Sequence, residues 1–364
     1  MKLVRLFSLL LMCLSIGCSQ QPSAEQSEAT SGPKQWLEFN GSGGAGNGKH
    51  IVLIAGDEEY RSEEAMPQLA KILSTHHGFK CTVLFSQDPA KPGIVDPNHQ
   101  THIPNTAALD SADLMIIGTR FRNLPDDQMK HVDDFLMAGK PVVGLRTATH
   151  AFKIDEGNYA HYSFNYKGDK TAWKNGFGEL ILGTTWVSHH GWHKVEATRG
   201  ITIGKSEINN GIGEGDIFGE SDVYGVTWPA DNDCVPHVMG VVLAGMEKDS
   251  APIGPGPYEK VPGYGKHEGF HKNDPMMPVT WTKSYQLPGG KKGTAFTTTM
   301  GASIELQYEG TRRMIVNGVL SILGMEVPAG GAKVDIVGDF KPNMYGFLKD
   351  PYWDENVVYV SDFE

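Results

Sequence analysis

The stretch Lys140–Phe152 constrains the fold of this chain more than any other. Its valines, Val142 and Val143, follow a proline and are typical of a buried strand, which a glycine then ends. The chain next turns at Arg146 and enters a short helix that carries His150. A strand that turns sharply into a helix raises one side chain at its carboxyl end, beside the free N–H groups of the helix. Ligands bind at that edge of open α/β sheets, so Arg146 is a candidate binding residue; a surface arginine in an ordinary turn is the alternative.

The segments before this turn alternate between strand and helix. Apolar runs predict strands at 50–55, 81–85 and 114–117, and residues 66–73 and 125–136 carry apolar side chains at helical spacing. This order is typical of a parallel sheet with helices on both faces. We therefore predict an α/β fold with three α/β/α layers.

The second half of the chain is less regular. Glycine-rich turns separate short expected strands, and a last helix has apolar residues at helical spacing. We expect this strand-rich half to pack on the α/β core. The expected strands are 193–197, 221–228, 237–244, 278–286 and 293–300, and the helix covers 316–323.

The first eighteen residues are typical of a bacterial lipoprotein signal. Lys2 and Arg5 precede an apolar run that is too short to span a bilayer, and Leu14–Cys18 resembles a lipobox. Cys18 would then carry a lipid and place the protein at the cell envelope; a plain cleaved signal peptide is the alternative. The expected domains are a signal peptide at 1–18, a flexible tether at 19–48, a folded domain at 49–327 and an irregular C-terminal tail at 328–364.

Composition argues against some functions. Removal of Lys2 and Arg5 with the signal takes the formal net charge from −11 to −13, and basic residues are not clustered, so nucleic acid is not an expected partner. Besides Cys18, the mature chain has only Cys81 and Cys234, and therefore lacks a disulfide framework.

Four motifs, in this order, resemble the ThuA-like (trehalose utilisation) family. They are the turn Gly144–His150, the cluster His189–His193, the block Asn273–Tyr285 and the late segment Gly293–Gly301. The family is a branch of the class I glutamine amidotransferase-like superfamily, so the resemblance implies a flavodoxin-like fold. It also implies a carbohydrate ligand, because ThuA-like proteins are linked to the use of trehalose and related disaccharides through 3-keto-sugar intermediates.

The chain departs from its superfamily at the nucleophile. Amidotransferases carry a cysteine where this chain has Arg146. Thiolate attack on an amide needs a raised cysteine beside a histidine base, and neither Cys81, on an expected strand, nor Cys234, in an expected loop, can replace it. Glutaminase activity is therefore excluded. Many ThuA-like chains also place a histidine where this chain has Ala302, so a role of that histidine does not carry over.

An arginine at such a turn can bind a carboxylate, a phosphate or vicinal sugar oxygens and can stabilise a developing oxyanion. We expect three further loops at the same edge: 57–64, 118–123 and the histidine cluster. The alternative for the first loop is acids at a helix start that favour the helix dipole, and the alternative for the second is a solvated charged loop. The predicted catalytic residues are Glu59, Arg146 and His190, of which Glu59 and His190 transfer protons. The predicted substrate-binding residues are Glu58, Tyr60, Arg120, Arg122, Thr147, His150, Trp192 and His193.

The cluster His189–His193 has three histidines in five residues. Such histidines can be zinc ligands, acids or bases near neutral pH, or polar packing residues. Gly191 disfavours a regular helical pair of His189 and His193, no cysteine is close in sequence, and the acid Glu196 falls on an expected strand. We therefore expect a protein that needs no metal or other cofactor.

The resemblance implies a protein that binds or transforms a disaccharide or a 3-keto-sugar. Trp192, with Trp186, would offer a flat apolar face to a sugar ring. A sugar-binding lipoprotein without turnover is one alternative, because the amidotransferase nucleophile is absent. A metal-dependent hydrolase that uses the histidine cluster is another.

We predict that the chain is anchored to a membrane through Cys18, because the lipobox precedes a segment poor in bulky apolar residues. Expressed in bacteria and fractionated, the unaltered protein should extract only with detergent, whereas Cys18→Ser should appear in the soluble fraction. Equal solubility of the two proteins would contradict the anchor.

Overall fold

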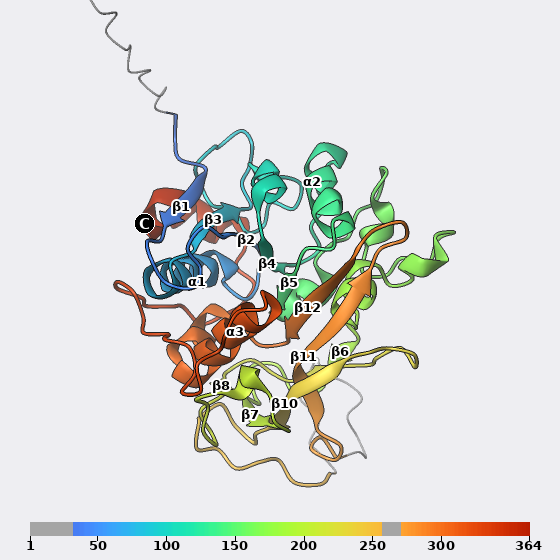
Figure 1. Cartoon of the computed structure of the whole chain (residues 1–364), viewed down its shortest axis with the longest axis vertical. Helices are drawn as coiled ribbons and strands as arrows, with labels where there is room; N and C mark the ends of the chain where they lie inside the picture. The colour runs from blue at the N-terminus through green and yellow to red at the C-terminus, as the bar shows by residue number, and fades with distance from the viewer. Residues whose placement is uncertain (1–31, 257–270) are drawn as a thin grey trace, which may run out of the picture. The chain divides into compact units, whose positions relative to one another are not determined.

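The computed structural model describes residues 32–256 and 271–364 (Figure 1). The expected signal peptide and Cys18 lie outside these residues. Residues 34–364 form one compact unit, which includes the C-terminal tail. Among the helices of the described residues, none combines the length and apolar character needed to span a membrane.

Within the described residues, ten strands form one mixed sheet in the order β1-β3-β2-β4-β5-β12-β11-β10-β7-β8. The five neighbouring strands β3, β2, β4, β5 and β12 run parallel to one another. The remaining pairs, β1–β3 at one end and those from β12 to β8 at the other, are antiparallel. A second sheet pairs β6 with β9. The strand bounds are β1 Trp36–Asn40, β2 His50–Gly56, β3 Lys80–Phe85, β4 Leu114–Thr119, β5 Val142–Leu145, β6 Ser188–His189, β7 Thr198–Thr202, β8 Phe218–Gly219, β9 Tyr224–Gly225, β10 Val235–Val242, β11 Met277–Gln286 and β12 Lys292–Thr298.

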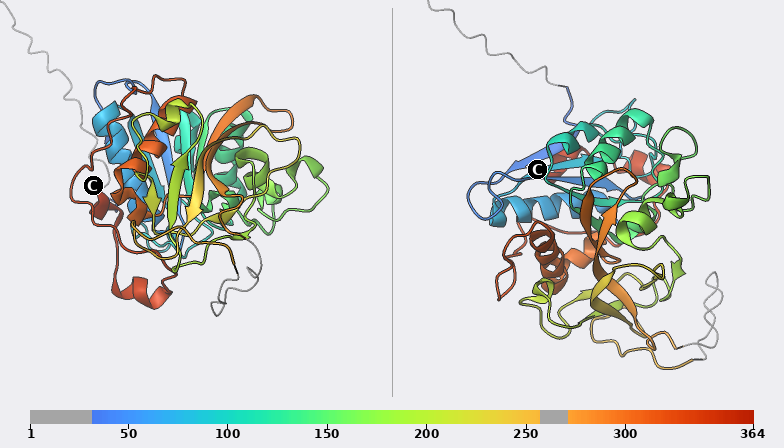
Figure 2. Two further views of the ribbon diagram at one scale, coloured as in Figure 1. Left: turned by 90° about the horizontal axis from the view of Figure 1, so that it is seen from below. Right: turned by 45° about the vertical axis from the view of Figure 1, so that its right-hand side comes forward.

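Helices pack on both faces of this sheet (Figure 2). In the fully buried β2, Ile51 and Leu53 face a core that includes α1 and α3, and Val52 and Ile54 face a second core that includes α2. The helix bounds are α1 Ser62–His77, α2 Asp126–Met137, α3 Glu309–Ile322 and α4 Asp350–Glu355. The short helices are η1 Thr106–Ser111, η2 Arg146–His150, η3 Ala160–Tyr162, η4 Thr171–Trp173, η5 Gly178–Leu182, η6 Glu207–Asn209, η7 Ser303–Gln307 and η8 Val360–Phe363.

From the sequence, we expected the second half of the chain to pack on the parallel sheet as a separate part. The structure shows a different arrangement. The second half continues that sheet, because residues 295–298 of β12 pair in parallel with residues 142–145 of β5. Strand β12 then pairs with β11, and the antiparallel strands follow. The prediction of a strand at 193–197 is also wrong. The N–H groups of Val195 and Glu196 both donate to the backbone oxygen of Trp192, so the chain forms a turn there.

The flexible tether expected at 19–48 does not extend over its whole range. Residues 36–40 form β1, which pairs antiparallel with β3 at the edge of the sheet. Leu37 is buried and joins the core against α1. Trp36, Leu37 and Phe39 carried the apolar signal for this strand within a polar segment.

We predict that the folded unit needs β1. A chain that begins at Lys49 loses the burial of Leu37, which contributes about 2 kcal/mol, as well as the pairing with β3. It should unfold at a clearly lower temperature than a chain that begins at Lys34, measured by circular dichroism. Equal unfolding temperatures would show that β1 contributes nothing to stability.

Candidate functional site

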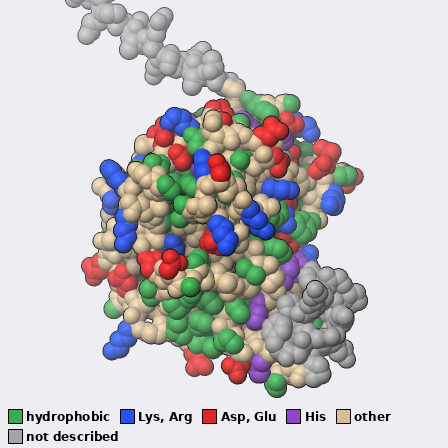
Figure 3. Space-filling view, turned by 90° about the vertical axis from the view of Figure 1, so that its right-hand side faces the viewer, with side chains coloured by type: hydrophobic (Ala, Val, Ile, Leu, Met, Phe, Trp, Pro, Cys, Tyr) green, Lys and Arg blue, Asp and Glu red, His purple; other side chains and the backbone are tan. Residues whose placement is uncertain are grey.

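Loops after β2, β4 and β5 meet a turn near His189 and part of the C-terminal tail around a pocket of about 390 Å³. Histidine side chains reach the molecular surface on the face shown in Figure 3. The pocket has aromatic walls and charged or polar groups together. Its lining residues are Glu59, Arg120, Phe121, His150, Trp186, His189, His193, Lys194, Tyr224 and Phe347.

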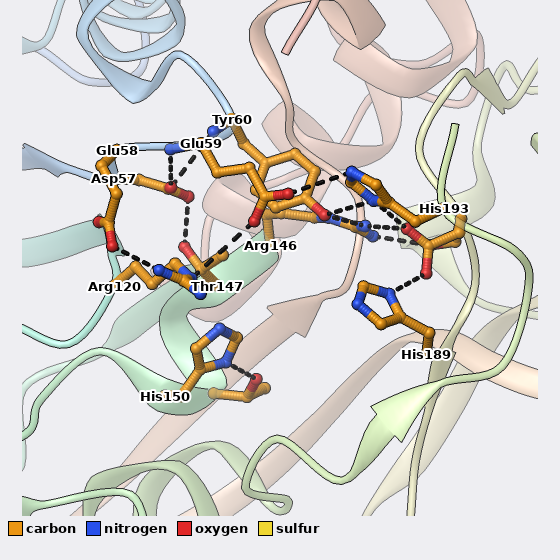
Figure 4. Close-up of polar contacts among 12 residues, drawn as sticks. Asp57, Glu58, Glu59, Tyr60, Arg120, Arg146, Thr147, His150, His189 and His193 are labelled. Carbon is orange, nitrogen blue, oxygen red and sulfur yellow. Dashed lines mark hydrogen bonds and ion pairs between the residues drawn. The ribbon is translucent and has the colours of Figure 1, made fainter. Parts of the chain in front are cut away.

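Arg146 is buried and begins η2 with a backbone φ of 46°, a left-handed conformation that is uncommon for residues other than glycine. Its guanidinium donates to the carboxylate of Asp222 at 2.9 Å and to the backbone oxygens of Asp222 and Thr299 at 2.8 and 2.6 Å. Figure 4 shows Arg146 near Tyr60 and the two histidines His189 and His193. The guanidinium carbon lies 4.3 and 3.8 Å from the ring centres of Tyr60 and Tyr224. We expected Arg146 to contact a ligand, but it does not line the pocket. It instead holds other residues of the site in place.

Asp222 connects Arg146 to the histidine cluster. Its buried carboxylate lies 2.8 Å from Nδ1 of His189 through Oδ2 and 3.2 Å from Nδ1 of His193 through Oδ1. Burial alone would raise the pKa of Asp222, but Arg146 and the hydrogen bonds from both histidines outweigh it and hold the pKa well below its usual range. Asp222, an acid that the sequence analysis did not single out, therefore connects Arg146 to the cluster, although Arg146 does not share the pocket that His189 and His193 line.

Glu59 faces the pocket beside His193. Its Oε1 lies 3.2 Å from Nε2 of His193, and its Oε2 lies 3.9 Å from Nε of Arg120. Burial, together with the neighbouring Asp57, raises the pKa of Glu59 to about 8, although Arg120 and Arg146 act in the opposite direction. A carboxyl group in this environment can hold a proton near neutral pH and exchange it.

Asp57 holds the loop that carries Glu59. Its Oδ1 accepts from the backbone N–H groups of Glu59 and Tyr60 at 2.8 and 3.2 Å, and its Oδ2 accepts from the hydroxyl of Thr147 at 2.6 Å. The hydroxyl of Tyr60 accepts from Arg146 at 3.0 Å. Tyr60 and Thr147 are buried and do not line the pocket, so they position Glu59 and Arg146.

Glu58 forms ion pairs with two arginines. It lies 2.7 Å from the buried guanidinium of Arg122 and also contacts Arg120. Arg122 further donates to three backbone oxygens, two of them in the loop after β3, so this group fixes the loops after β2, β3 and β4 to one another. Arg120 alone of the three lines the pocket, and its guanidinium carbon lies 4.9 Å from the ring centre of Phe347.

The remaining predicted residues differ in their access to the pocket. His150 lines it among aromatic rings, and burial holds its pKa well below the usual range, so the imidazole is neutral. His190 does not line it, because its Nε2 lies 2.6 Å from the backbone oxygen of Lys272. Trp192 is also outside it, with Nζ of Lys272 3.8 Å from its ring centre, and Trp186 forms the aromatic wall instead.

The C-terminal tail contributes residues that the sequence analysis missed. Phe347 lines the pocket and is half exposed, and the N–H of Gly346 donates to the backbone oxygen of Glu59 at 2.7 Å. Tyr345 stacks on Tyr60, with 4.9 Å between ring centres. The aromatic residues of the tail were visible in the sequence, but nothing local indicated which of them reach the site.

Three side chains of the site can together hold a metal ion. One ligand atom each from His189, His193 and Asp222 lies within 4.8 Å of the other two. The sequence analysis had only the histidines, because Asp222 follows them in the chain after about thirty residues and carries no local metal-binding pattern.

No family model and no curated protein matches this chain. Among solved structures, a protein described as ThuA-like from Bacteroides uniformis has 13% identity and a TM-score of 0.42 over 78% of this chain and 95% of that one. A protein described in the same way from Parabacteroides merdae has 13% identity and a TM-score of 0.43 over 82% and 97%. The N-terminal domain of mmIFT52 has 13% identity and a TM-score of 0.37 over 76% and 98%. At these values, neither a family nor an activity follows from the similarities.

We predict that Arg146 is essential for stability. Arg146→Gln leaves the buried charge of Asp222 without its cationic partner and should lower the free energy of unfolding by about 3–5 kcal/mol, measured with urea. Lys130→Gln, which removes an exposed ion pair with Asp134, should lower it by less than about 1 kcal/mol. Similar small losses in both variants would contradict the structural role of Arg146.

Proposed function

We propose that this protein is a ThuA-like, lipid-anchored protein of the cell envelope with a three-layer, flavodoxin-like core, and that it transforms a disaccharide or a 3-keto-sugar. The reaction is proton transfer at a carbon next to a carbonyl group. The observation that carries this proposal is the chain of contacts from Asp222 through His193 to Glu59, which ends in an aromatic-walled pocket.

Glu59 and His193 are the proposed acid–base pair. Glu59 accepts or returns the proton at carbon, and His193, whose Nε2 lies 3.2 Å from Glu59, serves the neighbouring oxygen. Asp222 fixes the orientation of the imidazole through Nδ1. This assignment moves the second proton-transfer role from His190 to His193, because only the latter lines the pocket.

The rest of the pocket suits a sugar. Trp186, Phe121 and Phe347 provide apolar ring surface, and Arg120 and His189 provide polar groups for hydroxyl or carbonyl oxygens. A cation beside the carbonyl oxygen stabilises the negative charge that develops when the adjacent carbon loses its proton. Arg120 is the cationic side chain closest to Glu59 in this wall, at 3.9 Å.

The test is exchange of the carbon-bound proton. A 3-keto-disaccharide incubated with the protein in deuterated water should lose the NMR signal of the hydrogen next to its carbonyl group, and product signals should follow. Glu59→Gln and His193→Gln should each slow this exchange by at least about 100-fold. His190→Gln, in the same cluster but outside the pocket, should retain it.

Three outcomes separate the candidate functions. If exchange persists in Glu59→Gln, the assignment of Glu59 as the base is wrong. Binding of the sugar by calorimetry with no exchange or turnover would favour a non-catalytic sugar-binding protein. Absence of both binding and exchange would overturn the carbohydrate proposal itself.

A further inference from the structure

We infer that His189, His193 and Asp222 form a site for one divalent metal ion of the zinc type. The three residues come from separate parts of the fold: the turn at β6 carries both histidines, and the segment before β9 carries the aspartate. Two imidazoles and a carboxylate are a ligand set that zinc and its neighbours prefer. The structure thus supplies a third ligand, Asp222, that we had not identified when we expected a protein without metal.

The distance from each histidine to Asp222 is close to that between ligand atoms of such a site, and the three ligand atoms lie within 4.8 Å of one another. Nδ1 of His189 lies 2.8 Å from Oδ2 of Asp222, and Nδ1 of His193 lies 3.2 Å from Oδ1. Ligand atoms of a tetrahedral zinc site are about 3.3 Å apart, given bonds of about 2.0 Å. Small movements of the side chains would therefore make room for an ion where hydrogen bonds now join the two histidines to Asp222.

The surroundings of His193 also match those of a metal ligand. A histidine that binds a metal through one ring nitrogen usually donates the other N–H to a carboxylate or carbonyl. Nε2 of His193 lies 3.2 Å from the carboxylate of Glu59, while Nδ1 faces Asp222. The ring is thereby oriented with Nδ1 toward the proposed ion.

Within the described residues, the site has three protein ligands and borders the pocket. The side chain of His189 is 29% exposed, and both histidines line the pocket. Three protein ligands with an open fourth position are typical of catalytic zinc sites. An ion held here would polarise a carbonyl or hydroxyl oxygen of a molecule in the pocket.

The positive charge of Arg146 beside Asp222 repels a metal ion and limits the affinity of the site for it. The guanidinium contacts Oδ1 at 2.9 Å, but it also donates to two backbone oxygens and lies over the rings of Tyr60 and Tyr224. These groups offset part of its charge. Asp222 retains Oδ2, on the side of His189, for the ion.

The test uses cobalt(II) alone as the probe, because tetrahedral Co²⁺ absorbs visible light more strongly than the hydrated ion. Protein cleared of metal by dialysis against a chelator should bind about one equivalent of Co²⁺ and develop this absorption, and Zn²⁺ should displace it. His189→Ala should weaken binding at least about tenfold. His189 is partly exposed, so this variant should fold, and circular dichroism checks that it does.

Two further variants make the result decisive. Asp222→Asn should also weaken Co²⁺ binding, and His190→Gln, a histidine of the same cluster outside the triad, should leave it unchanged. The inference is overturned if no stoichiometric absorption develops, or if binding survives in folded His189→Ala. Metal binding is measured without a sugar, so it can fail while the proposed reaction stands. An ion bound through Nδ1 of His193 would take over the role of that histidine at the neighbouring oxygen.

Discussion

The ion pair between Arg146 and Asp222 is the interaction on which the rest of the site depends. A buried carboxylate is costly unless it is paired and hydrogen-bonded, and Asp222 is surrounded by Arg146, His189 and His193. The guanidinium of Arg146 in turn lies over the rings of Tyr60 and Tyr224. Loss of either Arg146 or Asp222 leaves the other with an uncompensated buried charge, so this pair holds the loops that carry them in one arrangement.

The mixed sheet explains why the members of this network come from distant parts of the chain. Parallel strands β2, β4 and β5 place the loops after them at one edge. The pairing of β5 with β12 joins the antiparallel half to the same sheet, and this half carries the histidine turn and Asp222. The site therefore lies where the parallel and antiparallel parts meet.

Sequence reasoning succeeded where periodicity or strand direction determines position. The apolar patterns located β2–β5 and helices α1–α3, and the shared edge of parallel strands brought Glu59 and Arg120 together. It failed in the histidine turn, because contacts distant in sequence decide which side chains face the pocket: the N–H groups of His190 and Gly191 both donate to Val223. Asp222 was missed for the same reason, since no local pattern marks a single buried aspartate.

The turn after β5 keeps a strained geometry although it carries no nucleophile. Arg146 has a φ of 46°, and its N–H donates to Met300 on the neighbouring segment, so the backbone turns as sharply as one that presents a reactive side chain. The arginine side chain extends to Asp222 in the second half and stays out of the pocket. The proton transfer that we propose at this edge therefore relies on the surrounding loops, which bring Glu59 and His193 into contact.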